Sequence, residues 1–123
     1  MKIQESAENY LETILILHKR NGAVRSIDIA TELEVSKPSV SVAMKHLREN
    51  GYIEMDHHGY ISLLPTGNEI AQNMYERHLF LSKWLQTLGV SEQTALTDAC
   101  RIEHVISAES FDALREHVRQ EGK

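Results

Sequence analysis

The sequence predicts a mainly α-helical fold that contains one small β-hairpin. Apolar side chains recur at helical spacing through most of the chain. The exception lies between residues 52 and 63, where two short strand-like runs flank a polar turn that ends in Gly59. Three helices, a hairpin and then only helices is the order of a winged helix-turn-helix domain, here residues 1–64, followed by an all-helical domain, residues 65–123.

Three helices are expected before the hairpin. The first spans residues 4–20 and ends where an Asn-Gly pair follows. Ser26 is a good N-cap for a second, short helix over residues 27–34. Ser36 is expected to cap a third helix that ends near Asn50, just before a glycine.

Three further helices are expected after the hairpin. Thr66 and Glu69 have the spacing of a capping box, which would open a long fourth helix. Ser91 is expected to cap a fifth helix, and Ser107 a short sixth one that ends near residue 118, before a frayed tail. A long helix that begins directly after a wing commonly leads into a dimerisation region.

The composition is that of a folded protein without a membrane segment. Hydrophobic residues make up 41% of the chain and charged residues 25%, which is not the balance of a disordered chain. No apolar run is long enough for a signal peptide core or a membrane span. Cys100 is the only cysteine, so no intrachain disulfide can form. We therefore expect a cytoplasmic protein with no membrane partner.

The charge is unevenly distributed along the chain. The net charge of −5 is unfavourable for binding nucleic acid if the molecule is taken as a whole. Residues 37–48 nevertheless carry Lys37, Lys45 and Arg48 and no acidic residue. An acidic body with one basic segment can bind DNA more readily when a bound cation offsets part of the repulsion.

The basic segment coincides with a helix-turn-helix pattern. Residues 29–40 contain a small residue, Ala30, that allows two helices to approach, then a short turn and a polar, basic helix. The start of that helix offers backbone N–H groups to phosphates, and Val42 can contact a thymine methyl group. The residues expected to contact DNA are Arg25, Ser36, Lys37, Pro38, Ser39, Ser41, Val42 and Lys45. The alternative is a small helical core with a solvated basic face. The hairpin directly after the third helix favours the winged helix-turn-helix over this alternative.

A second group of residues has the spacing of a metal site. Cys100, Glu103 and His104 stand at positions i, i+3 and i+4 of the predicted fifth helix, so their side chains project from one face. A thiolate, a carboxylate and an imidazole suit Fe²⁺, Mn²⁺, Co²⁺, Ni²⁺ or Zn²⁺ better than Ca²⁺ or Mg²⁺. Three ligands on one helix leave coordination positions open. Candidates to complete the site are Glu8, Asn9 and Glu12 on the first helix and His78 on the fourth.

Other interpretations of these residues remain open. Cys100 can be a small buried residue, His104 a satisfied core histidine and Glu103 a solvated one. A Cys/His pair can also serve a thiol enzyme. Because no third orienting group or oxyanion pocket is visible, we do not expect an enzyme. A winged-helix regulator that responds to a small organic ligand is a further alternative.

Several segments, in this order, resemble the iron- and manganese-dependent transcriptional repressors related to the diphtheria toxin repressor and the manganese transport regulator. They are residues 8–14, 28–30, 36–41, 64–67, 77–79 and 98–107. The resemblance implies a two-domain form without the SH3-like domain of longer members. It also implies a homodimer with two metal sites per subunit, which binds palindromic double-stranded operator DNA when loaded with Fe²⁺ or Mn²⁺ and controls metal homeostasis genes.

The resemblance also implies a ligand set. The matching positions are Glu12, His78, Cys100, Glu103 and His104. Asn9 stands where the iron branch carries methionine and the manganese branch aspartate, and its amide oxygen can also ligate a metal. The second domain is therefore expected to be both the metal-binding and the dimerisation domain.

The sequence departs from the iron branch at two positions. Ser82 and Leu96 stand where that branch has the glutamate and the histidine of its ancillary site, which argues against an ancillary site of that type. The thiolate of Cys100 favours iron, whereas Glu12 and the lost ancillary ligands favour manganese. Fe²⁺ and Mn²⁺ both remain open, and Co²⁺, Ni²⁺ or Zn²⁺ is expected to substitute in vitro.

Overall fold

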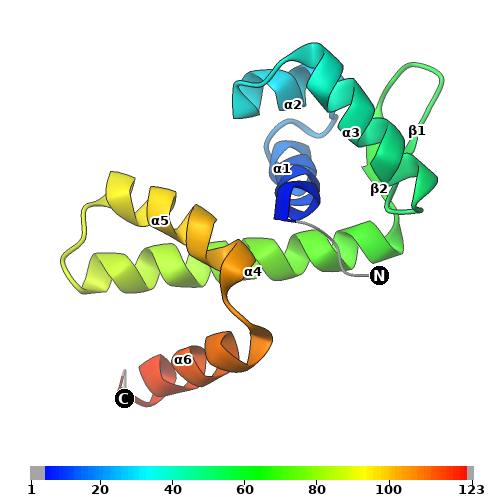
Figure 1. Ribbon diagram of the computed structural model, residues 1–123. Helices are drawn as coiled ribbons and strands as arrows, with labels where there is room; N and C mark the ends of the chain where they lie inside the picture. Colours follow the sequence, from blue (N-terminus) through cyan, green and yellow to red (C-terminus); the bar gives the residue numbers. More distant parts are fainter. Residues whose placement is uncertain (1–4, 122–123) are drawn as a thin grey trace. The chain divides into compact units, whose positions relative to one another are not determined.

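The computed structural model describes residues 5–121 and confirms a mainly α-helical fold with one hairpin (Figure 1). Its elements are α1 (Glu5–Asn21), α2 (Ser26–Leu33), α3 (Lys37–Glu49), β1 (Ile53–Met55), β2 (Ile61–Leu63), α4 (Pro65–Thr87), α5 (Glu92–Val105) and α6 (Ala108–Glu121). The described residues form two compact units, one up to Asn73 and one from Met74 on, with α4 beginning in the first. None of the helices in this range combines the length and the apolar character needed to cross a membrane.

The first unit is a three-helix core closed by the hairpin. Figure 1 shows α3 and the hairpin side by side, and α1 and α2 contribute to the same core. The apolar residues that meet in it are fully or almost fully buried. They include Leu11, Ile14, Val24, Ile29, Val40, Met44, Leu47, Ile53 and Ile61. Burial of these side chains is the main contribution that holds the winged domain together.

The start of α3 is the one that the sequence predicts, but the start of α2 is not. The Ser36 hydroxyl accepts a hydrogen bond from the Ser39 backbone N–H at 3.3 Å, which confirms this N-cap. At α2 the N-cap is Arg25, and Ser26 is already helical. The backbone N–H of Arg25 donates to the Asp28 carboxylate at 2.9 Å. A charged acceptor binds an N–H more strongly than a hydroxyl does, so Asp28 moves the helix start by one residue.

The hairpin is short and tightly turned. β1 and β2 are antiparallel, with Glu54 opposite Ser62. The two predicted strand-like runs, residues 52–55 and 60–63, each begin one residue before the strand that forms. In the turn, the Asp56 carboxylate accepts hydrogen bonds from the backbone N–H groups of His58 and Tyr60, each at 2.9 Å. These two bonds satisfy backbone donors that the two-stranded sheet itself does not use.

The predicted capping box at the start of α4 is wrong. The helix already begins at Pro65, so Thr66 lies inside its first turn. The Thr66 hydroxyl donates to the Gly51 carbonyl at 2.8 Å, just beyond the end of α3. Gly67 lies so close to Tyr52 that a Cβ atom there would overlap the Tyr52 carbonyl oxygen. The Thr66 hydroxyl therefore bonds to a residue distant in the chain and does not cap its own helix.

The second unit packs α5 and α6 on the later part of α4. Leu81, Ala99 and Phe111, one from each helix, form its buried centre. Partly buried hydrophobic residues surround them, namely Phe80, Trp84, Ile102, Ile106 and Leu114. These contacts set the positions of α4 and α5 in this unit.

The helix starts in the second unit are confirmed, but its last helix is longer than expected. The Ser91 hydroxyl accepts from the Thr94 N–H at 3.3 Å, and the Ser107 hydroxyl accepts from the Ser110 N–H at 3.0 Å. Helix α6 continues to Glu121, so part of the expected frayed tail is helical. Pairs at helical spacing, formed by Glu116 with Arg119 and Gln120, stabilise this last turn. The rest of that tail lies outside the described residues.

Candidate metal centre and DNA interface

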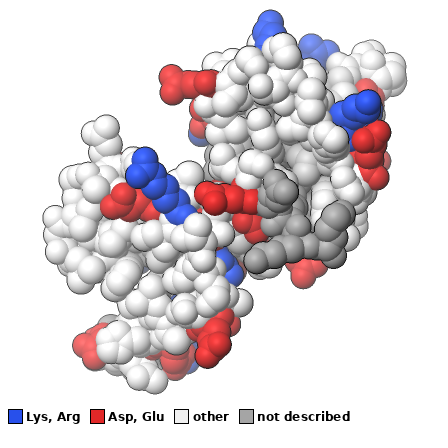
Figure 2. All heavy atoms as spheres, in the orientation of Figure 1, with Lys and Arg blue, Asp and Glu red and all other residues white. Residues whose placement is uncertain are grey.

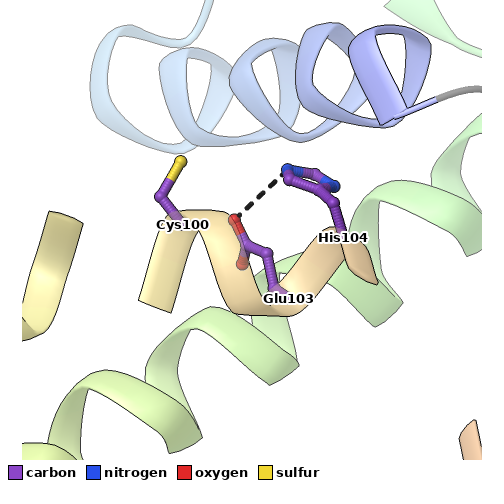
Figure 3. Close-up of side chains that lie close together, drawn as sticks. All are labelled: Cys100, Glu103 and His104. Atoms are coloured by element: carbon purple, nitrogen blue, oxygen red, sulfur yellow. Dashed lines mark ion pairs between the residues drawn. The ribbon is translucent and has the colours of Figure 1, made fainter. Parts of the chain in front are cut away.

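Three ligand-type side chains gather on one face of α5. Figure 3 shows Cys100, Glu103 and His104 projecting together from this helix. Their sulfur, carboxylate oxygen and ring nitrogen atoms all lie within 4.8 Å of one another. The i, i+3, i+4 spacing on a regular helix is sufficient to bring them together.

Glu103 is the centre of this group. Its side chain is fully buried, with Oε1 3.5 Å from His104 Nε2 and Oε2 3.6 Å from Nδ1 of His78 on α4. A carboxylate in such a place is costly unless opposite charge or a metal ion compensates it. Nδ1 of His78 is buried and makes no hydrogen bond within the described part of the chain. Two imidazoles therefore approach one buried carboxylate from two helices.

The two distances from Glu103 to the histidines are those of neighbouring metal ligands. Metal–ligand bonds of about 2.0–2.2 Å place neighbouring ligand atoms about 2.8–3.6 Å apart in tetrahedral or octahedral geometry. The two separations from Glu103 to the histidines lie in this range and exceed an ordinary hydrogen bond. Nitrogen, oxygen and sulfur donors together are the set that a divalent transition metal accepts. The second unit thus brings three of the sequence-predicted ligand residues together, Cys100, Glu103 and His104, and places the fourth, His78, beside Glu103.

The remaining candidate residues are described within their own elements. Glu12 is buried and Asn9 is half-buried on α1 of the first unit, so their contribution to the centre stays a prediction. Ser82 is buried on α4, and its hydroxyl donates to the Leu79 carbonyl of its own helix at 3.2 Å. Leu96 is exposed on α5.

The predicted DNA-contacting residues are exposed on the first unit. On α3, Val40 and Met44 enter the core, whereas Val42 between them is 56% exposed. An apolar side chain that is excluded from the core of a polar helix is available for a groove contact. The other residues of this set are exposed too, namely Arg25, Ser36, Lys37, Pro38, Ser39, Ser41 and Lys45. Figure 2 shows basic side chains on the upper edge of this unit, over the start of α3.

The N-terminus of α3 arranges its hydroxyl groups in a defined way. Ser36 Oγ donates to Ser39 Oγ at 2.8 Å and also accepts the Ser39 N–H. The Ser36 proton is therefore used inside the cap, while the Ser39 hydroxyl proton can still donate. Of the two serines, Ser39 is the better placed to donate to a phosphate oxygen.

Arg25 has a second role that the sequence does not reveal. Its Nη2 donates to the His58 carbonyl at 2.7 Å, and its guanidinium lies 4.6 Å from the centre of the Tyr60 ring. Both partners belong to the turn region of the hairpin, far from Arg25 in the chain. Arg25 thus attaches the wing to the start of α2, and no local pattern in the sequence could have indicated that contact.

Comparison with protein families gives two matches that together span most of the chain. A model of the family described as "Iron dependent repressor, N-terminal DNA binding domain" matches residues 2–61. A second, described as "Iron dependent repressor, metal binding and dimerisation domain", matches residues 64–120.

Similar full-length proteins are transcriptional regulators. The chain is 36% identical over 119 residues to the transcriptional regulator MntR of Salmonella typhimurium, covering 97% of this chain and 76% of that protein. It is 33% identical over 114 residues to the HTH-type transcriptional regulator MntR of Geobacillus kaustophilus, covering 93% of this chain and 81% of the relative.

Solved structures share the fold. The manganese regulator SloR superposes with a TM-score of 0.81 at 24% identity, covering 97% of this chain and 55% of that one. The metal-dependent transcriptional regulator MtsR gives a TM-score of 0.83 at 25% identity, covering 92% of this chain and 53% of that one. The chain therefore spans about half the length of these solved chains.

Proposed function

We propose a specific role for this chain, which belongs to the family of iron-dependent repressors. In this role it is a metal-dependent transcriptional repressor that binds operator DNA as a homodimer when a divalent transition metal is bound. The genes that it controls are those of metal homeostasis. The observation that carries the proposal is the buried Glu103 carboxylate between two imidazole nitrogens, beside Cys100, in a chain that also contains a winged helix-turn-helix.

The two functions are assigned to two parts of the chain. We propose residues 1–64 as the DNA-binding domain and residues 65–123 as the metal-binding and dimerisation domain. The descriptions of the two family matches support this division. The single cysteine and the proposed DNA target favour a cytoplasmic location.

The proposed ligands in the second unit are His78, Cys100, Glu103 and His104. A bound divalent ion would supply the positive charge that compensates Glu103 and the Cys100 thiolate. His78 and His104 would bind the ion through the ring nitrogens that face the Glu103 carboxylate.

Glu12 and, more weakly, Asn9 are proposed as ligands from α1. Their assignment rests on the family resemblance, since both residues lie in the first unit. If Glu12 takes part, a ligand from the DNA-binding domain belongs to the metal centre. Metal then favours DNA binding only to the extent that it binds the DNA-competent arrangement more tightly than the other arrangements of the protein.

The proposed DNA target is a palindromic duplex, because a two-fold symmetric dimer presents two copies of α3. Lys37, Lys45 and Arg25 are assigned to phosphates, and Val42 to a base edge in the groove. Pro38 and the serines of α3 complete this surface, which is exposed throughout.

The physiological ion is proposed to be Fe²⁺ or Mn²⁺, with Co²⁺, Ni²⁺ or Zn²⁺ as substitutes in vitro. Metal analysis of protein purified without oxygen, followed by DNA binding with each ion in turn, distinguishes the two. The ion that is retained and that gives the tightest DNA binding is the assigned effector.

The decisive variant is Glu103→Gln, which keeps the shape of the side chain but removes its charge. We expect loss of metal-dependent DNA binding, with metal affinity falling by more than the ~10–100-fold typical of residues that only support ligands. The measurement is fluorescence anisotropy with a duplex selected from a random pool by the Mn²⁺-loaded wild-type protein. Glu109→Gln, an exposed acid on α6, is the matched control. A Glu103→Gln protein that responds to Mn²⁺ as the wild type does would contradict the assigned centre.

A further inference from the structure

The C-terminal turn of α5 is held by a side chain from α4. Arg77 Nη1 donates to the Glu103 carbonyl at 3.1 Å and to the Ile106 carbonyl at 2.8 Å. The last carbonyl groups of a helix have no partner within the helix, and a cation is favourable at that end. Arg77 therefore caps the turn of α5 that carries Glu103 and His104.

Arg77 also lies directly before His78 in α4. His78 contributes the imidazole that faces Glu103 Oε2, and its neighbour Arg77 contacts the Glu103 backbone. One short stretch of α4 thus contacts both the side chain and the main chain of Glu103.

Helix α6 contributes to the position of Arg77. The Arg77 guanidinium carbon lies 5.3 Å from the centre of the Phe111 ring, within the range of a cation–π interaction. Phe111 is itself buried and fixed by an edge-on contact with Phe80 at 5.5 Å between ring centres. Arg115 lies 5.2 Å from the same ring, but its hydrogen bonds go to Glu76 and Asp112 on the surface.

We propose that Arg77 is a positioning residue for the metal centre. It sets the distance of Glu103 and His104 from His78 by capping the last turn of α5, and Phe111 of α6 fixes its guanidinium. This inference rests on the proposed function, because it concerns the same centre. Arg77 does not touch the ion in this role; it determines how closely the ligand atoms approach one another.

The test compares Arg77→Met with Arg115→Met. Methionine keeps much of the length and the apolar stem of either arginine but cannot donate to carbonyl groups. Arg115→Met is the matched control, because Arg115 lies near the same ring without contacting α5 carbonyls. The probe is Co²⁺, whose visible absorption bands report the number and geometry of its ligands. Affinity is measured by titration, and folding of the metal-free proteins by circular dichroism and thermal melting.

We expect Arg77→Met to shift the Co²⁺ bands and to weaken Co²⁺ binding about tenfold, which is the lower end of the effect of residues that orient ligands. Arg115→Met should leave the bands unchanged and the affinity within about twofold of the wild type. Arg77→Lys, which retains a charged donor but not the planar fork, should restore part of the wild-type affinity and spectrum. It also serves as the test if the methionine variant does not fold.

The outcomes separate the two proposals. If wild-type protein does not bind Co²⁺, the proposed function fails. If wild-type protein binds Co²⁺ and Arg77→Met has the same bands and affinity, only the positioning role of Arg77 is overturned. Equal changes in Arg77→Met and Arg115→Met would also overturn it, since the effect would then belong to packing around Phe111.

Discussion

Gly67 is the residue at which the start of α4 makes its closest approach to the rest of the first unit. A Cβ atom would overlap the Tyr52 carbonyl oxygen, and this oxygen already accepts the Leu64 N–H at 2.9 Å. We expect Gly67→Ala to lower the free energy of unfolding of metal-free protein by about 1–3 kcal/mol, the usual cost of forcing an extra carbon into a packed site. Urea denaturation followed by circular dichroism measures it.

Asn68→Ala is the control for that prediction. Asn68 is exposed one position further along the same helix, so the change removes atoms from the surface only. Its free energy of unfolding should stay within about 0.5 kcal/mol of the wild type. Equal stability of Gly67→Ala and Asn68→Ala would show that α4 can move away from Tyr52 at no cost.

At the scale of single residues, the sequence predicts what depends on nearby positions. The spacing of Cys100, Glu103 and His104 places their ligand atoms together because all three lie on one helix. Arg77 and Thr66 could not be assigned in this way. Their carbonyl partners, Ile106 and Gly51, lie 29 and 15 positions away, and only the packing of the helices brings them together.

At the scale of elements, the carboxylate of Asp56 stabilises the turn of the wing. The Tyr60 backbone N–H donating to Asp56 holds the pKa of that carboxyl below its ordinary value of 3.8, and the His58 N–H acts in the same direction. A pKa that is lowered by folding means that the turn gains stability from the ionised form. This contribution is complete above the ordinary value and is lost as the pH falls through the lowered one.

The hydrogen bonds to Asp56 therefore predict how the turn of the wing responds to pH. In an NMR titration of metal-free protein, the Asp56 carboxyl carbon should titrate with a midpoint below 3.8, and the His58 and Tyr60 amide signals should follow it. In Asp56→Asn these two amide signals should no longer titrate in that range, because the amide oxygen stays neutral. A wild-type midpoint at or above 3.8 would mean that the two hydrogen bonds do not persist in solution.

Helix boundaries show where element prediction succeeds. The caps at Ser36, Ser91 and Ser107 were predicted because each hydroxyl bonds to a backbone N–H three residues on, which is a local event. The start of α2 was missed because Ser26 and Asp28 both compete for it, and the stronger acceptor decides. The end of α6 was missed because side-chain pairs between Glu116 and its neighbours extend the helix.

At the scale of the whole molecule, a net charge of −5 must be reconciled with the proposed DNA binding. Figure 2 shows acidic side chains over α6 in the second unit, and basic ones over the start of α3 in the first. Helix α6 carries more acidic than basic side chains, whereas residues 37–48 of α3 carry basic side chains and no acidic one. Because surface charges are screened beyond about 8 Å at physiological salt, the phosphates respond mainly to the charges of α3 and its surroundings. A local basic surface can bind DNA on an acidic protein.

This view predicts the salt dependence of DNA binding. Each phosphate contact contributes about 0.9 to the slope of log K against log salt, so Lys37→Ala should reduce the slope by about 0.9 per protomer, or about 1.8 for a homodimer. The measurement is anisotropy with the selected duplex at saturating Mn²⁺ over a series of salt concentrations. Lys83→Ala is the matched control, since Lys83 is exposed on α4 in the second unit and should leave the slope unchanged. An unchanged slope in Lys37→Ala would remove Lys37 from the phosphate contacts. Equal reductions in both variants would instead indicate that the net charge of the molecule, rather than the surface of α3, controls binding.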